Sequence, residues 1–327
     1  MENSDNVKAV PQPTSSNSKE WKLIEKTVAT LGVEQRRTRR WGIFFKLLTF
    51  AYLFILLGVM ANGLSPNGMQ VDSENYTALI DVRGVIADQE DASADVIVTG
   101  LRSAFEAEGA KAVILRINSP GGSPVQSGYV YDEIKRLRGL YPEKKLYAVI
   151  TDLGASGAYY MAAAADEIYA DKASLVGSIG VTAAGFGFVD LIDEYGVERR
   201  TYTSGEHKAF LDPFSEENPE EVAFWKTVLT STHQQFIDKV KEGRGDRLVE
   251  NDKLFSGLIW NGEQALELGL IDGLGSSSYV ARELVGAEDI VDFSLQPDPF
   301  QQFTESLGVS IGGAISSVLG LNTMQLR

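Results

Sequence analysis

Ser156 has the neighbours that a nucleophilic serine needs. It lies between Gly154 and Gly157, where a predicted buried strand at residues 145–152 meets a predicted helix at residues 158–165. Glycines let the backbone bend sharply and let a substrate approach closely, and the first turn of a helix favours developing negative charge. The pattern indicates acyl-transfer chemistry, although an ordinary serine N-cap would have the same local sequence.

A second glycine turn, Gly121-Gly122, follows another predicted buried strand at residues 111–117. The carboxyl ends of neighbouring parallel strands lie at one edge of a sheet, where active sites form. Two adjacent glycines at this edge expose backbone N–H groups, which could stabilise an oxyanion. A tight turn without a catalytic role is the alternative.

A serine nucleophile also needs a base. The sequence around Ser156 differs in one glycine from the G-x-S-x-G turn of α/β-hydrolases, so a Ser-His-acid triad with His207 or His233 has to be considered. We expect His233 to be a packed or solvated helix residue. His207 directly precedes Lys208 in a loop, and these residues alone leave open which of the two side chains faces the serine.

The composition narrows the class of protein. The chain has no cysteine, which excludes a thiol nucleophile and a disulfide framework. Two histidines argue against a His/Cys zinc site, and we expect neither a metal nor another cofactor. The formal net charge of -15 argues against nucleic acid as a partner, because phosphate binding needs clustered lysine and arginine.

The elements that must position these residues begin at residue 76. Predicted strands at 77–86, 111–117 and 145–152 alternate with predicted helices at 93–108, 125–137 and 158–165. Such alternation predicts an α/β domain with a parallel sheet. Asn218 followed by Pro219 marks the start of a further helix, whose apolar positions have helical spacing.

The N-terminal part has a different pattern. Residues 1 to about 35 are polar, and we expect them to be mostly disordered. Together with the basic cluster at residues 36–40 they form a predicted cytoplasmic tail over residues 1–40. Residues 41–61 then form a run of roughly 20 mainly apolar residues, enough to cross a bilayer as a helix. The basic cluster places the N-terminus inside and the rest of the chain outside. A cleaved signal peptide or a buried core helix are the alternatives.

Several short motifs are found in the α/β part of the chain. They are Asn118-Ser-Pro-Gly-Gly122, Gly154-Ala-Ser-Gly157, Gly177-Ser-Ile-Gly180, Ser204-Gly-Glu-His-Lys-Ala209 and Trp260-Asn-Gly-Glu-Gln-Ala265 with Gly269-Leu-Ile-Asp272. Together these motifs resemble the signal peptide peptidase A family. They occur in this order within residues 76–275. The resemblance implies a Clp/crotonase-like α/β fold built from repeated β-β-α and βαβ units. The chain resembles the short members of the family, which have one peptidase unit, whereas the double-length members carry two.

The same resemblance implies roles for five residues. Ser156 matches the nucleophile and Lys208 the general base, while Ser178 matches a serine that hydrogen-bonds the lysine. The amides of Gly122 and Gly157 match the oxyanion hole. A lysine base must be neutral to accept a proton, so we predict that Lys208 is desolvated in the assembled site.

The resemblance further implies a serine endopeptidase that degrades cleaved signal peptides and other hydrophobic peptides. It implies a homo-oligomer in which Ser156 and Lys208 come from different subunits, held in the bacterial inner membrane with the peptidase domain outside the cytoplasm. The expected organisation is a tail at 1–40, an anchor in membrane lipid at 41–61, a linker at 62–75, a peptidase domain at 76–295 and a C-terminal tail at 296–327.

Three rival functions remain. The first is an ester or thioester hydrolase with a Ser-His-acid triad. The second is a catalytically silent scaffold for the assembly of membrane proteins. A crotonase-like enzyme acting on acyl-CoA is disfavoured, because a domain outside the cytoplasm would have no supply of CoA.

Overall fold

The computed structural model describes residues 15–63 and 75–295. They divide into two compact units, Met1–Gly68 and Met69–Arg327. The predicted C-terminal tail and most of the predicted linker lie outside the described residues.

The described part of the first unit is one helix, α1, which spans Ser15–Gly63. We expected residues 15–35 to be mostly disordered, and the structure differs. No proline follows Pro13 before the end of α1, and Gly32 is the one glycine before the basic cluster. Long polar side chains with good helix propensity therefore continue the helix without a breaker.

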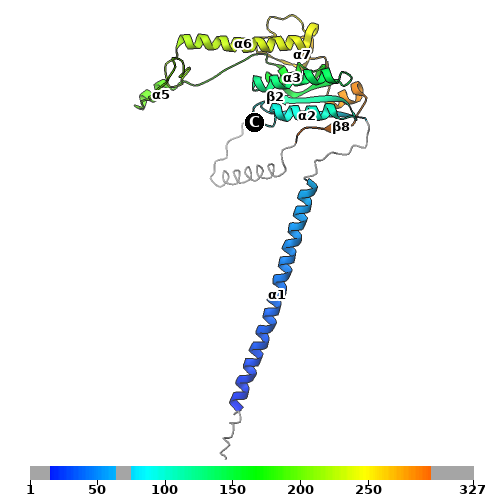
Figure 1. The fold of residues 1–327 in the computed structure, drawn as a ribbon, viewed down its shortest axis with the longest axis vertical. Coiled ribbons are helices and arrows are strands. Elements are labelled where there is room, and N and C mark those ends of the chain that lie inside the picture. Colours follow the sequence, from blue (N-terminus) through cyan, green and yellow to red (C-terminus); the bar gives the residue numbers. More distant parts are fainter. Residues whose placement is uncertain (1–14, 64–74, 296–327) are drawn as a thin grey trace, which may run out of the picture. The chain divides into compact units, whose positions relative to one another are not determined.

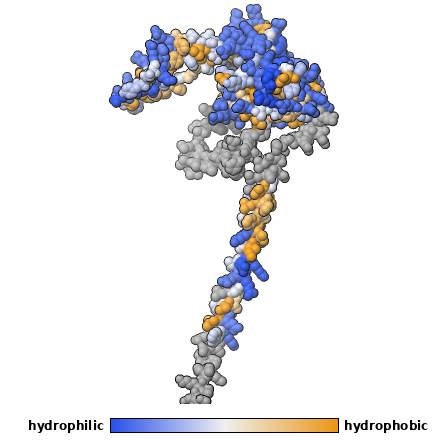
Figure 2. All heavy atoms as spheres, viewed as in Figure 1, coloured by the Kyte–Doolittle hydropathy of each residue, from blue (hydrophilic) through white to orange (hydrophobic). Residues whose placement is uncertain are grey.

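The middle of α1 carries exposed aromatic and aliphatic side chains, including Trp41, Phe44 and Phe54. Figure 2 shows a hydrophobic band along part of α1. No helix within residues 15–63 and 75–295, as far as their side chains are described, combines the length and apolar character needed to cross a membrane. The side chains of residues 56 and 59–61 lie outside the description, so the anchor at 41–61 stays a prediction.

The second unit is built on a sheet with the strand order β6-β5-β3-β2-β1-β8, and β4 pairs with β3 and β7. All pairs are parallel except β5 with β6. The predicted parallel α/β sheet is therefore confirmed. The strands are β1 Tyr76–Arg83, β2 Ala110–Ser119, β3 Leu146–Ala155, β4 Glu167–Ala170, β5 Leu175–Gly177, β6 Ile259–Asn261, β7 Gly273–Leu274 and β8 Ile290–Asp292.

Helices connect these strands (Figure 1). The three predicted between residues 93 and 165 are confirmed as α2, α3 and α4, and Asn218 caps α6 by accepting a hydrogen bond from the Glu220 amide. The helices are α2 Ala94–Glu106, α3 Pro124–Leu140, α4 Gly157–Ala162, α5 Val189–Glu194, α6 Pro219–Arg244, α7 Gly262–Glu267 and α8 Ser277–Tyr279, with a 3-10 turn at Gly245–Arg247 and a π turn at Val280–Val285.

The core lies on both faces of the sheet because strand side chains alternate in direction. Ile80, Leu115 and Ile150 pack in the larger cluster with α2, α3 and α4. Leu79 and Ile114 point to the other face and pack in a smaller cluster against the π turn. Since both faces are covered, the central strands are continuous apolar runs, as in other parallel sheets.

Residues 181–218, which we call the arm, leave this core after β5. The structure describes this stretch throughout, and none of its residues is buried. Figure 1 shows α5 on the arm, away from the sheet. Local contacts hold the arm together: Arg199 pairs with Asp212 at 3.0 Å, and the rings of Phe188 and Phe214 stack at 5.4 Å.

The arm leads into α6, whose other end is fixed to the core. Arg244 is 1% exposed and donates from Nη1 and Nη2 to the Asp272 carboxylate at 2.7 and 3.0 Å. Asp272 also accepts the Ile168 amide of β4 at 2.7 Å. Helix α6 therefore connects the buried core to the exposed arm.

Candidate active site

Ser156 follows β3 in a strained turn. Its φ of 54° and ψ of -127° are rarely adopted by a residue with a side chain. It occupies the N-cap position of α4, yet its side chain makes no capping hydrogen bond. Its amide donates to the Gly177 carbonyl at 2.8 Å. The serine is thus held by its backbone, while its hydroxyl is not used for capping.

The Gly121-Gly122 turn lies directly against this serine. A methyl group on Gly121 would stand 2.7 Å from both the Gly157 nitrogen and the Ser156 Cβ, and the φ values of the two glycines are 93° and 153°. Only glycine fits so close an approach at these φ values. The second glycine forms a parallel bridge with Ile86, which fixes the turn.

Two backbone amides beside Ser156 are unpaired. Among the described residues, neither the Gly122 nor the Gly157 N–H has a protein acceptor. A methyl group on Gly157 would stand 3.3 Å from the Gly122 nitrogen, so the two amides lie close together. Free N–H groups next to a nucleophile can stabilise the negative charge of a tetrahedral intermediate.

Ser178 lies in a second strained turn. Its φ is 50° and that of Gly177 is 106°. The Ser178 amide donates to the Leu258 carbonyl at 2.8 Å, and the Gly177 carbonyl accepts the Ser156 amide. A single peptide unit therefore connects the two serines.

These residues share one cavity of about 770 Å³. Ser156, Ser178, Gly122 and Gly157 all line it, so the structure brings four of the five predicted site residues together. Its described lining residues include no lysine and no carboxylate. They are Val85, Pro120, Gly121, Gly122, Pro124, Ser156, Gly157, Tyr160, Ser178, Gly180, Val181, Thr182, Thr232, His233, Gln235, Phe236, Ser256 and Gly257.

Lys208 is the predicted residue that is not among them. It lies on the arm, is exposed, and donates its amide to the Gly205 carbonyl at 3.2 Å. The desolvated environment that we predicted for it is not present in the single chain. His207 beside it is also exposed, and its Nδ1 lies 3.9 Å from the Glu221 carboxylate.

His233 was not predicted to be in the site, and the structure places it on the cavity wall. It is half-buried on α6, and its Nε2 lies 3.1 Å from the Ile179 carbonyl. The sequence carries one signal for this position: His233 is three residues before the apolar Phe236, and residues with that spacing share a helix face. Phe236 is 5% exposed and lines the same cavity.

Tyr160 also lines the cavity. Burial raises the pKa of its phenol, nearby Lys239 lowers it less, and Asp132 adds to the rise. The group therefore stays protonated at neutral pH and can act as a hydrogen-bond donor.

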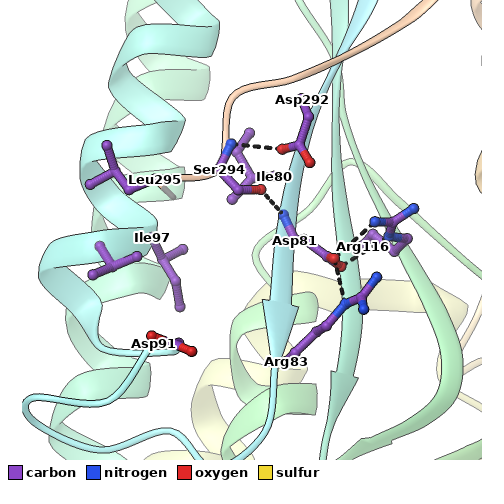
Figure 3. A pocket seen from close by; sticks show the side chains of 10 residues that line it. Ile80, Asp81, Arg83, Asp91, Ile97, Arg116, Asp292, Ser294 and Leu295 are labelled. Carbon is purple, nitrogen blue, oxygen red and sulfur yellow. Dashed lines mark hydrogen bonds and ion pairs between the residues drawn. The ribbon is translucent and has the colours of Figure 1, made fainter. Parts of the chain in front are cut away.

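A second cavity of about 320 Å³ lies between α2 and the strands β1 and β8 (Figure 3). Three of its charged side chains are paired with each other, since Asp81 binds both Arg116 and Arg83. None of the predicted site residues lines it. Within residues 15–63 and 75–295, no cluster of three or more histidine or carboxylate groups could hold a metal ion.

Comparisons with known proteins agree with a peptidase site. Residues 140–290 match the model of peptidase family S49. The chain is 48% identical over 186 residues to a Brucella abortus protein named "Na(+)/H(+) antiporter NhaA", a match that covers 57% of this chain and 25% of that protein.

Two further relatives carry protease names. "Serine protease SPPA, chloroplastic" of Arabidopsis thaliana is 35% identical over 57% of this chain and 27% of its own length. "Putative protease slr0021" of Synechocystis is 32% identical over 68% of this chain and 79% of its own length. The chain thus spans about a quarter of the Brucella and Arabidopsis proteins and most of the Synechocystis one.

Proposed function

Because the chain belongs to peptidase family S49, the signal peptide peptidase A family of serine peptidases, we propose that it is an endopeptidase with a Ser156–Lys208 dyad. The observation that carries this proposal is the turn at Ser156. A strained serine without a capping bond lies beside two unpaired amides in one cavity.

The proposed reaction begins when neutral Lys208 takes the proton of the Ser156 hydroxyl. The serine oxygen attacks a peptide carbonyl, and the Gly122 and Gly157 amides donate hydrogen bonds to the oxyanion. Protonated Lys208 then gives its proton to the leaving amine. Water, activated by the same lysine, hydrolyses the acyl-enzyme and restores both groups. Ser178 orients the lysine by a hydrogen bond.

The proposed site needs a second copy of the chain. The described lining of the cavity includes no lysine, and Lys208 lies on an arm without buried residues. The arm also exposes large apolar side chains: Phe186 is 81% exposed, Tyr195 74% and Tyr202 90%. Exposed apolar surface of this kind is typical of a protein interface. We propose a homo-oligomer in which the arm of one subunit brings Lys208 to the Ser156 of its neighbour.

The proposed substrates are cleaved signal peptides and other hydrophobic peptides. We also propose that residues 41–61 anchor the chain in the bacterial inner membrane, with the N-terminus in the cytoplasm and the peptidase domain outside. The exposed aromatic and aliphatic side chains of α1 support the anchor, and so does the basic cluster that precedes them. An anchored peptidase would meet such substrates at the bilayer surface.

One observation favours a second candidate function, a Ser-His hydrolase. His233 shares the cavity with Ser156, whereas Lys208 of the same chain does not. Against this candidate, the carbonyl of Ile179 can only accept a hydrogen bond. The His233 Nε2 must therefore be protonated in this arrangement and unable to accept the serine proton.

The experiment compares the full-length protein, in detergent or lipid, with its variants on a hydrophobic signal-peptide substrate. Ser156→Ala and Lys208→Ala should lower kcat by roughly a thousandfold or more, while His207→Ala keeps most of it. Lys226→Ala, which removes an exposed lysine on α6, is the matched control.

The outcomes separate the candidates. An active Lys208→Ala variant together with an inactive His233→Ala variant would replace the dyad by a Ser-His pair. A chain that neither cleaves peptides nor reacts at Ser156 with a serine-directed acylating probe would be a silent scaffold.

A further inference from the structure

The turn that carries Ser178 is held on three sides. On one side the Gly177 carbonyl accepts the Ser156 amide, and on another the Ser178 amide donates to Leu258, both at 2.8 Å. The third contact comes from α6, where the His233 Nε2 lies 3.1 Å from the Ile179 carbonyl. Both Gly177 and Ser178 have φ values in the left-handed region, so the turn needs such contacts to keep its shape.

Helix α6 can hold this turn because it is itself fixed next to the cavity. Phe236, one helical turn after His233, is 5% exposed, and its ring lies 5.0 Å from that of Tyr160 on α4. The imidazole is therefore presented from a packed part of the helix. Ile179 is 0% exposed, so its backbone is also in a packed environment.

The hydrogen bond also determines which role the Nε2 nitrogen has. A carbonyl oxygen only accepts, so Nε2 carries a proton in this arrangement. While this bond exists, Nε2 cannot serve as a base for Ser156. Nε2 therefore acts as a hydrogen-bond donor to the backbone in this arrangement.

We propose that His233 is a positioning residue, whose Nε2–H group holds the Ile179 carbonyl and so keeps Ser178 and Ser156 in register for the dyad. This inference rests on the proposed peptidase function. Displacement of the Ile179 peptide would move Ser178, and through the Gly177 carbonyl it would also move the Ser156 amide. One contact from α6 thus orients both serines of the site.

The test uses two variants of the full-length protein. His233→Gln places an amide N–H near the position of the imidazole Nε2 and keeps the donor, while His233→Leu removes it at similar volume. His233→Leu should lower kcat by roughly 10- to 100-fold, because small misplacements of catalytic groups have effects of this size. KM should change little, and His233→Gln should recover most of kcat. Gln234→Leu, an exposed neighbour outside the cavity lining, is the matched control.

The results separate this inference from the peptidase function itself. A Leu variant as active as the wild type would overturn the positioning role. Glutamine cannot replace an imidazole base, so equal and complete loss in both variants would instead identify His233 as the base. If the wild-type protein and Ser156→Ala are equally inactive on peptides, the peptidase function fails.

If the protein does not cleave peptides, the hydrogen bond of His233 can still be tested by NMR. The chain has two histidines, so a protein labelled with 15N-histidine gives two sets of ring signals, and His207→Ala assigns them. The inference requires the Nε2–H tautomer with a slowly exchanging proton at His233. An Nδ1–H tautomer or a rapidly exchanging ring proton would refute it, whatever the activity.

Discussion

The cavity around Ser156 and the arm that carries Lys208 are held in different ways, although one chain provides both. Ser156 lies between Ala155 and Gly157, which are both buried, and its amide is bonded to β5. The arm is described throughout and has no buried residue. Its shape depends on local contacts, such as Arg199 with Asp212 and the Leu211 amide with the Glu221 carboxylate at 3.0 Å.

This contrast between the cavity and the arm shows which part of the proposed site a single chain can form. The nucleophile and both candidate oxyanion donors are preorganised by the sheet and its glycine turns. The loop that carries Lys208 has a defined local shape. In our proposal, the distance from Lys208 to a Ser156 hydroxyl depends on how the arm packs against a neighbouring subunit. In our proposal, oligomerisation would then control catalysis, since an isolated chain would hold the serine without its base.

The largest expected effect is the recovery of peptidase activity when two inactive variants, one changed in the cavity and one in the arm, are mixed. Ser156→Ala and Lys208→Ala should each be inactive alone, and co-expression in equal amounts should restore about a quarter of the wild-type activity. Half of the cavities would carry the serine, and half of the neighbours would supply the lysine. Peptide cleavage by co-purified mixed oligomers measures this. No recovery in oligomers shown to contain both variants would place both residues of the site in one chain.

The second prediction concerns the cavity side alone. A methyl group in Gly157→Ala would stand 2.4 Å from the Ser127 Oγ and would force the turn at Ser156 to shift. Losing the alignment of one oxyanion donor should lower kcat by roughly 10²- to 10³-fold. The matched control is Gly128→Ala on α3, where no atom lies within 4 Å of the new methyl group. Equal activity of both variants would remove Gly157 from the oxyanion hole.

The third prediction concerns the arm alone. Glu221→Ala removes the acceptor of the Leu211 amide, and Leu211 has a φ of 51° in the loop after Lys208. We expect kcat/KM to fall by about 10-fold through misplacement of the lysine loop, with little change in the Tm of the core. Glu221→Gln keeps an acceptor oxygen and should be milder, and Glu220→Ala is the control. A large fall in Tm would show that the arm contributes to global stability.

The smallest effect is expected at a contact between α2 and α3, outside both the cavity lining and the arm. Hydrogen bonds from Arg136 and then Arg102 lower the pKa of Glu133 to about 2, although burial opposes the shift. A carboxyl whose pKa is lower in the folded state stabilises the fold above its ordinary pKa and loses this contribution as pH falls toward about 2.

Glu133→Gln should therefore reduce the free energy of unfolding in urea at pH 7, and the difference from wild type should shrink between pH 4.5 and 2. Arg102 and Arg136 are half exposed, so solvent screening keeps the effect small. Peptidase activity at pH 7 should be unchanged. A difference that stays constant with pH would mean that the charge of Glu133 does not stabilise the contact between α2 and α3.

Local sequence was sufficient for the fold class, whereas the roles of the five site residues were implied by the family resemblance. The apolar runs that became β2 and β3 predicted buried parallel strands, because such strands are covered on both faces. The glycines at 121 and 122 predicted a sharp turn, and their φ values of 93° and 153° favour residues without a side chain. Asn218 with Pro219 predicted the start of α6 for an equally local reason.

Other features depended on contacts between distant segments. His233 is an ordinary helix residue in the sequence, and only the packing of α6 against the turn after β5 brings it to Ile179, 54 residues away. The helical conformation of residues 15–35 was missed because polar composition alone suggested disorder.

The sequence by itself determined the chemical groups of this protein: a serine between glycines, two candidate oxyanion donors and a lysine in a short loop. Only the tertiary structure decided which of them meet. Hydrogen bonds of the sheet bring the two serines and the two glycine turns to one cavity, whereas the arm has no buried contacts that would carry Lys208 there. The types of these residues and their spacing are given directly by the sequence. Which of their side chains lie close together depends on packing between segments that are far apart in the chain.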